Sequence, residues 1–150
     1  MNIYIDADGC PVVKETINVA KQFEIPVIII CDAAHYFMHE GVQTITVMPG
    51  SDAVDYEIIN RLQPGDLVIT QDYGLGVLVL AKKGYAMNQN GRTYEDHNID
   101  QLLFTRHLSS KLRQSGQRLK GPKKRTREDT QQFILALSNF LKSTQEGQSH

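Results

Sequence analysis

Short apolar runs of strand length alternate along the chain with segments whose apolar residues recur at helical spacing. The apolar runs predict strands over residues 2–6, 27–31, 42–47, 67–70 and 85–88. Helical spacing and capping residues predict helices over residues 11–23, 52–62, 72–83 and 98–114 and from 126 onward, with a short helix or turn at 33–40. This alternation is typical of α/β proteins, so we expect a three-layer αβα fold with a central, mostly parallel, five-stranded sheet.

The size and polarity of the chain predict one globular domain. The 150 residues are 41% apolar and 22% charged, values typical of a domain that buries its own core. We assign residues 1–142 to this domain and expect the polar residues 143–150 to form a disordered tail. No apolar run approaches the ~20 residues of a membrane helix, and no signal-peptide pattern follows Met1. Together with two cysteines that form no CxxC pattern, these features predict a cytoplasmic protein without a membrane partner.

Aspartates follow the predicted strands at the edge where ligands bind in parallel sheets of this class. Asp6 and Asp8 come directly after the first strand, and Asp72 comes after the fourth. Asp52 and Asp55 lie in the first turn of a helix, where their (i, i+3) spacing places both on one side. Carboxylates that converge repel each other unless a cation lies among them, and all-oxygen sites suit Mg²⁺ or Mn²⁺. The aspartates therefore predict a divalent metal site able to support phosphoryl displacement.

Four of these aspartates, Asp6, Asp8, Asp52 and Asp72, also have a second interpretation. Asp52 and Asp72 lie where helix caps are expected, and for Asp52 capping explains the residue as well as ligation does. Asp8 precedes Gly9 and is a common turn residue. The DxDG order that begins at Asp6 is also the pattern of aspartyl-phosphate hydrolases, in which the first aspartate is the nucleophile.

Charge is divided between an acidic first part of the chain and a basic later part. Residues 1–100 carry 6 Lys and Arg against 14 Asp and Glu, whereas residues 101–150 carry 10 against 3. The segment before the last predicted helix has the charge density of a phosphate-binding loop and leads into a helix N-terminus. We expect phosphate contacts from Arg118, Lys120, Lys123, Lys124 and Arg125. A solvated connector is the alternative explanation for such a run of charge.

Four motifs, taken together and in order, resemble the YaiI/YqxD family of bacterial proteins, which is regarded as similar to PIN-like nuclease domains. The motifs are IYIDADGCP at residues 3–11, PGSDAVD at 49–55, GDLVITQDYGLG at 65–76 and a GPxxxTxED core within 118–129. The resemblance implies a sheet in the order 3-2-1-4-5, which makes the first and fourth strands neighbours. It also implies that Asp6, Asp55 and Asp72 are the acids of the site, with Asp52 as the alternative to Asp55. Arg125 stands where an aromatic residue is expected and makes the loop more basic.

The combined interpretation is a nuclease of PIN-like type that depends on Mg²⁺ or Mn²⁺. It is expected to hydrolyse phosphodiester bonds of RNA or other single-stranded nucleic acid, with RNA favoured over DNA. Catalysis is assigned to Asp6, Asp55 and Asp72, and Asp8 and Asp52 are placed beside them at the metal. Two alternatives remain open: a non-catalytic nucleic-acid-binding module, and a small-molecule phosphatase that forms a phosphoaspartate at Asp6.

Overall fold

The structure, a computed structural model, describes residues 1–32, 39, 41–50, 52–96, 98 and 124–148. Its strands are β1 (Ile3–Asp6), β2 (Val27–Asp32), β3 (Gln43–Val47), β4 (Leu67–Ile69) and β5 (Tyr85–Met87). Its helices are α1 (Val13–Gln22), α2 (Ala53–Arg61), α3 (Tyr73–Ala81) and α5 (Arg127–Gln148). The sequence pattern predicts all of these elements with small differences at their ends, apart from the end of α5. The elements predicted at 33–40 and 98–114 fall almost entirely outside the described residues.

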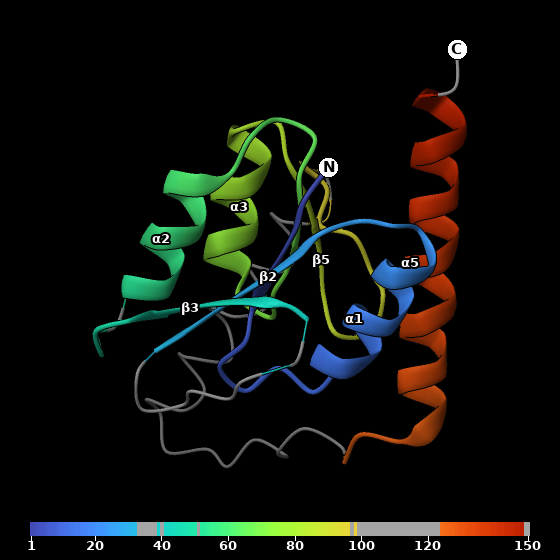
Figure 1. Ribbon diagram of the computed structural model, residues 1–150, viewed down its shortest axis with the longest axis horizontal. Coiled ribbons are helices and arrows are strands. Elements are labelled where there is room, and N and C mark those ends of the chain that lie inside the picture. The colour runs from blue at the N-terminus through green and yellow to red at the C-terminus, as the bar shows by residue number, and fades with distance from the viewer. Residues whose placement is uncertain (33–38, 40, 51, 97, 99–123, 149–150) are drawn as a thin grey trace.

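All strand pairs are parallel, and the five-stranded sheet has the order β3-β2-β1-β4-β5. Ile5 of β1 lies opposite Ile29 of β2 on one side and opposite Ile69 of β4 on the other. Figure 1 shows α2 and α3 together on one side of the sheet and α1 and α5 on the other. The three-layer fold and the strand order 3-2-1-4-5 are therefore confirmed, and β1 and β4 are neighbours in the middle of the sheet.

The two faces of the sheet bury separate cores because successive side chains of a strand point to opposite faces. In β1, Ile3 and Ile5 belong to the core that α1 and α5 cover, whereas Tyr4 belongs to the core under α2 and α3. Ile3 and Ile5 have no exposed surface. Burying such a side chain contributes about 1.5–3 kcal/mol. The near-continuous apolar runs of the sequence are the result of burial on both faces.

Helix α5 begins with a capping box formed by Thr126 and Asp129. The Thr126 N–H donates to Oδ2 of Asp129 at 2.9 Å, and the Asp129 N–H donates to Oγ1 of Thr126 at 3.2 Å. Phe133, Leu137 and Leu141 then follow on one face of the helix and are completely buried. Helix α5 therefore closes the core on the α1 side, as Figure 1 shows.

The prediction of a disordered tail from residue 143 is wrong for residues 143–148, because α5 continues to Gln148. The added turns are anchored to the body of the protein. Nε2 of Gln145 donates a hydrogen bond to the carbonyl oxygen of Phe23, just after α1, at 2.9 Å. The polar composition of this segment reflects an exposed helix rather than a lack of structure.

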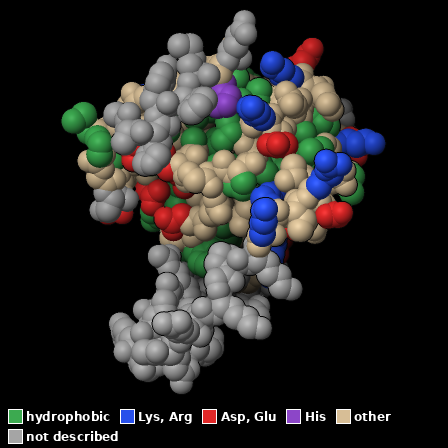
Figure 2. Space-filling view, turned by 90° about the horizontal axis from the view of Figure 1, so that it is seen from below, with side chains coloured by type: hydrophobic (Ala, Val, Ile, Leu, Met, Phe, Trp, Pro, Cys, Tyr) green, Lys and Arg blue, Asp and Glu red, His purple; other side chains and the backbone are tan. Residues whose placement is uncertain are grey.

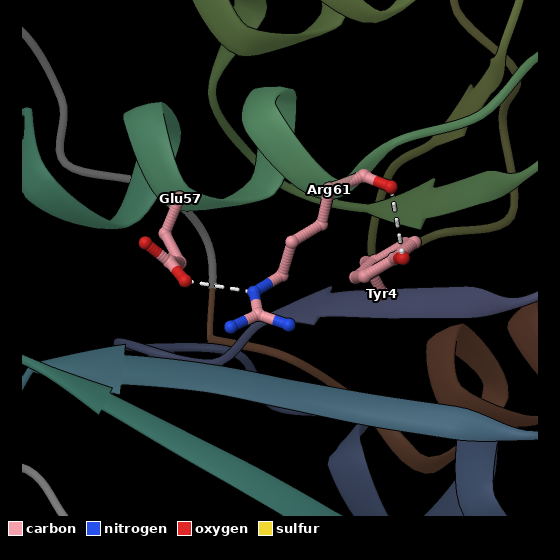
Figure 3. Close-up of polar contacts among 3 residues, drawn as sticks. All are labelled: Tyr4, Glu57 and Arg61. Carbon is pink, nitrogen blue, oxygen red and sulfur yellow. Dashed lines mark hydrogen bonds and ion pairs between the residues drawn. The ribbon is translucent and has the colours of Figure 1, made fainter.

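Helix α2 is tied to β1 and to α3 near its C-terminal end. The Tyr4 hydroxyl donates to the carbonyl oxygen of Arg61 at 3.3 Å (Figure 3). The Arg61 side chain is held in turn by Glu57, with 2.7 Å between Nε and Oε1 (Figure 3). Nζ of Lys82, which follows α3, donates to the carbonyl oxygen of Ile59 at 2.6 Å. These contacts fix the helix whose first turn contributes to the candidate site.

Helix α3 is apolar around its whole circumference. Leu75 and Val79 are completely buried, while Val77 and Leu78 on the outer face are 37% and 48% exposed. The helix has 9 residues, far fewer than the ~20 that cross a bilayer. Among the residues that the structure describes, no helix combines the length and the apolar character that crossing a membrane requires.

Candidate functional site

The carboxyl ends of the neighbouring strands β1 and β4 bring Asp6 and Asp72 to one edge of the sheet. Asp6 is the last residue of β1, and Asp72 is the N-cap of α3, just beyond β4. Both line a hollow of about 460 Å³, together with Asp8, Gln71 and Tyr73. The strand order thus brings together acids that are far apart in the sequence, because the neighbours β1 and β4 are not consecutive in the chain.

Asp8 extends this acidic edge toward β2. Its Oδ2 accepts a hydrogen bond from the backbone N–H of Asp32, at the end of β2, with 3.3 Å between the atoms. Figure 2 views the molecule from below Figure 1, the side on which β1 ends. On this face Asp and Glu side chains gather toward the left, and Lys and Arg side chains lie mainly on the right.

Thr70 connects Asp6, at the end of β1, with Asp72, at the start of α3. Its Oγ1 donates to Oδ2 of Asp6 at 2.7 Å and accepts the backbone N–H of Asp72 at 3.0 Å. Its carbonyl oxygen accepts a hydrogen bond from the Tyr94 hydroxyl at 3.0 Å. Thr70 and Tyr94 are only 1% and 3% exposed, so these bonds lie in a poorly solvated interior where they hold the groups firmly.

The first turn of α2 brings Asp55 to the same edge. The pKa of Asp55 is raised to about 6, first by burial and then by the negative charges of Asp72, Asp6 and Asp52. Charges perturb each other in this way only when they lie close together. The five predicted aspartates therefore form one electrostatic group, which we call the carboxylate cluster and which consists of Asp6, Asp8, Asp52, Asp55 and Asp72.

The environment of Asp6 also raises the pKa of its carboxyl group. Burial raises the pKa of Asp6, the hydrogen bond from Thr70 lowers it, and the charges of Asp8 and Asp72 raise it again. The net shift is upward. A cation placed among these groups would lower both pKa values, because an opposite charge favours the ionised carboxylate.

The structure distinguishes the two aspartates that could be simple helix caps. Oδ1 of Asp72 accepts the backbone N–H groups of Gly74 at 2.8 Å and of Leu75 at 3.3 Å, so Asp72 does cap α3. Asp52 occupies the N-cap position of α2 and makes no side-chain cap bond. Capping thus accounts for one oxygen of Asp72 and does not account for Asp52.

The chemistry of the carboxylate cluster fits a hard divalent cation. Its donors are all carboxylate oxygens, the ligands that Mg²⁺ and Mn²⁺ prefer. The pKa values of Asp6 and Asp55 are raised first by burial and then by the negative charges of neighbouring aspartates. In the described part of the chain, no three His, Cys, Asp or Glu side chains are grouped closely enough to hold a metal ion. The fold provides a concentration of negative charge rather than a finished coordination sphere.

Gln71 lines the hollow and connects two of its sides, although no sequence pattern indicates this role. Its Nε2 donates to the carbonyl oxygen of Gly9 at 2.9 Å, which ties the segment after β4 to the loop after β1. Tyr94 likewise carries no sequence signal, because it lies beyond β5 and outside the motifs. Both residues act through contacts between segments that are distant along the chain.

The predicted phosphate-binding residues are described only in part. Arg118, Lys120 and Lys123 lie outside the described residues. Lys124 is exposed, in the short segment that precedes α5.

Arg125 has a structural role that its charge alone does not predict. Its Nε donates to Oγ1 of Thr130 at 3.2 Å, Nη1 to Oδ1 of Asn90 at 2.8 Å and Nη2 to the carbonyl oxygen of Gln89 at 2.6 Å. The guanidinium therefore links the turn after β5 to the first turns of α5.

Comparison with known proteins identifies relatives along nearly the whole chain. Residues 4–143 match the family described as "Uncharacterized BCR, YaiI/YqxD family". A UPF0178 protein of Exiguobacterium sibiricum is 52% identical over 141 residues, which cover 94% of this chain and 96% of the relative. A UPF0178 protein of Ruminiclostridium cellulolyticum is 45% identical over 148 residues, 98% of this chain and 96% of the relative. No solved structure matches the chain. The chain belongs to the YaiI/YqxD family.

Proposed function

We propose that this protein is a divalent-metal-dependent nuclease that hydrolyses phosphodiester bonds of single-stranded nucleic acid, with RNA favoured over DNA. One observation carries the proposal. Asp6, Asp55 and Asp72 come from three different elements, and yet, after burial, the charges of Asp72 and Asp6 raise the pKa of Asp55 at a single edge of the sheet. Carboxyl groups with perturbed pKa values that gather at one edge of a sheet are typical of functional sites. The resemblance to PIN-like domains supports the same reaction at the level of the fold.

The carboxylate cluster would hold Mg²⁺ or Mn²⁺, with Asp6, Asp55 and Asp72 as the principal ligands and Asp8 and Asp52 beside them. When bound, such an ion neutralises charge on the phosphodiester and lowers the pKa of water. Without a cation, the negative charge of the cluster would repel a phosphodiester. Because of this repulsion, we expect both the binding of the substrate and the hydrolysis step to require the metal.

The chain's own residues orient the cluster. The Thr70 hydroxyl holds Oδ2 of Asp6, and the backbone N–H of Asp72 is held by the same hydroxyl. Positions fixed by buried hydrogen bonds need little reorganisation when substrate binds, which is how a site lowers the barrier to reaction. Flanking phosphates are assigned to the basic segment that includes Lys124, an exposed cation.

A non-catalytic nucleic-acid-binding module is the second candidate. It is favoured by one observation, that no three potential ligands among the described residues already form a metal-binding group. The two candidates differ in turnover. A binding module would hold RNA in a salt-dependent way and leave it intact in Mn²⁺.

The test is cleavage of end-labelled single-stranded RNA by highly purified protein in Mn²⁺, and in EDTA as the metal-free control. We expect Mn²⁺-dependent cleavage by the parent and loss of it in Asp6→Asn and Asp72→Asn, since an amide keeps the shape but removes the charge. Asp96→Asn is the matched control, because Asp96 is exposed and lines a different pocket beside β5. Equal cleavage by parent and Asp6→Asn would overturn the proposal. Binding without cleavage by the parent would favour the second candidate.

A further inference from the structure

A second pocket, of about 390 Å³, opens at the same end of the sheet as the carboxylate cluster. The loop after β1 and the first turn of α1 supply part of its wall, and Ile29 and Cys31 of β2 supply another part. Asp8 lines this pocket and also the acidic hollow. The two spaces are therefore neighbours that share one side chain.

The two pockets lie on opposite faces of the sheet. Asp6 pairs with Ile30, whose side chain belongs to the core under α2 and α3. Ile29 belongs to the core under α1 and α5. A ligand that reaches from the acidic hollow into the second pocket must therefore pass over the end of β1, across Asp8 and Gly9, which line the second pocket.

The second pocket combines an apolar wall with a few polar groups. Pro11, Val13 and Ile29 contribute apolar surface, and Glu15 and His39 contribute hydrogen-bonding groups. Cys10 also lines this pocket and packs against the core under α1 and α5. A cavity of this size, mostly apolar with a few polar groups, is the usual form of a site for a small organic group.

Building on the proposed nuclease function, we propose that this pocket binds the base of the nucleotide next to the phosphodiester that is cleaved. A nucleobase has apolar faces and a hydrogen-bonding edge, and the wall residues offer partners for both. The shared residue Asp8 places the pocket directly beside the phosphate position at the carboxylate cluster. Because a base must be unpaired to enter the pocket, we expect the site to accept single-stranded nucleic acid and to reject duplexes.

The first experiment uses the parent protein and needs no variant. End-labelled single-stranded RNA oligonucleotides each carry one abasic residue at a different position, and the cleaved linkages are mapped in Mn²⁺. We expect an abasic residue to reduce cleavage about tenfold at the linkage on one side of it, because the pocket then loses its occupant. Linkages farther away serve as the internal control. The same RNA annealed to its complement should be cleaved at least about tenfold more slowly.

The second experiment fills the pocket. Val13→Phe should lower cleavage of intact single-stranded RNA about tenfold and should remove the difference between intact and abasic positions. Val77→Phe is the matched control, since Val77 lies on the exposed outer face of α3 and lines neither pocket. Far-ultraviolet circular dichroism and thermal melting establish that both variants are folded.

The outcomes separate this inference from the proposed function. If the parent cleaves RNA in Mn²⁺ but cuts beside abasic residues as fast as elsewhere, or prefers duplex, the base pocket is wrong and the nuclease proposal stands. If Val13→Phe is folded and keeps the parent's discrimination, the pocket is also wrong. If the parent cleaves no oligonucleotide at all, the nuclease proposal fails, and the inference fails with it.

Discussion

The Thr70 hydroxyl donates a 2.7 Å hydrogen bond to Oδ2 of Asp6, and so joins the residue just after β4 to the acid at the end of β1. The same oxygen accepts the backbone N–H of Asp72 at 3.0 Å. One buried hydroxyl therefore sets the positions of two acids that belong to different segments of the chain. The network continues through the Thr70 carbonyl to Tyr94.

Replacing Thr70 by valine should therefore disturb both stability and the site. Thr70→Val keeps the shape, removes the donor to Asp6 and leaves the Asp72 N–H without its acceptor, so we expect a loss of about 1–3 kcal/mol in the free energy of unfolding. The pKa of Asp6 should rise further, because the hydrogen bond that lowers it is gone. Urea unfolding and NMR titration of Asp6 measure the two effects. Thr70→Ser keeps the hydroxyl and should restore both values, and a serine variant that behaves like valine would contradict the assignment.

The raised pKa of Asp55 predicts how stability depends on pH when no metal is present. The folded protein binds a proton at Asp55 more tightly than the unfolded chain does, with a pKa raised from 3.8 to about 6. In that pH window the native state holds more protons, so the free energy of unfolding should fall as pH rises through it. Thermal melting in EDTA across this range measures the slope. Asp55→Asn should flatten the slope and raise the melting temperature above the window, whereas Asp96→Asn should leave both unchanged.

The three hydrogen bonds of Arg125 predict a structural effect from a residue of the basic segment. Arg125→Ala should lower the free energy of unfolding by about 1–3 kcal/mol, because Nη1 and Nη2 no longer hold Asn90 and the Gln89 carbonyl. Arg127→Ala, at the exposed first residue of α5 two positions later, is the control and should change stability by less than about 0.5 kcal/mol. Urea unfolding measures both. Equal effects of the two substitutions would mean that charge rather than the specific bonds of Arg125 matters.

Gly91 allows α5 to pack against the turn after β5. Its φ is +86°, and a Cβ built there would lie 2.5 Å from Cβ of Ala136. Gly65 has a similar φ of +89° with no atom within 4 Å of a built Cβ. Gly65→Ala should thus cost about 1–2 kcal/mol from the backbone alone, and Gly91→Ala about 1–3 kcal/mol more from the steric contact. Urea unfolding measures the loss of unfolding free energy in each variant, and the difference between the two losses reports the steric contact with α5. Equal losses in the two variants would show that α5 packs less tightly against Gly91.

Much of the fold follows from patterns that are local in the chain. Apolar runs at 27–31 and 67–70 predict buried strands, and the pattern Thr126 to Asp129 predicts the start of α5, because these signals depend on neighbouring residues only. The acids of the site are also visible locally, since each follows a strand or opens a helix. Their residue types determine that the site, if it binds a metal, suits a hard cation.

Tertiary structure decided what those residues touch. The end of α5 at Gln148 depends on a contact between Gln145 and Phe23, and the role of Arg125 depends on a turn some thirty-five positions earlier in the chain. Likewise, Tyr94 and Gln71 belong to the site only because strands β1, β4 and β5 lie side by side. The spacing of apolar residues indicates which face of an element is buried. It does not indicate which distant segment covers that face, because hydrogen bonds between segments form only when the chain has folded.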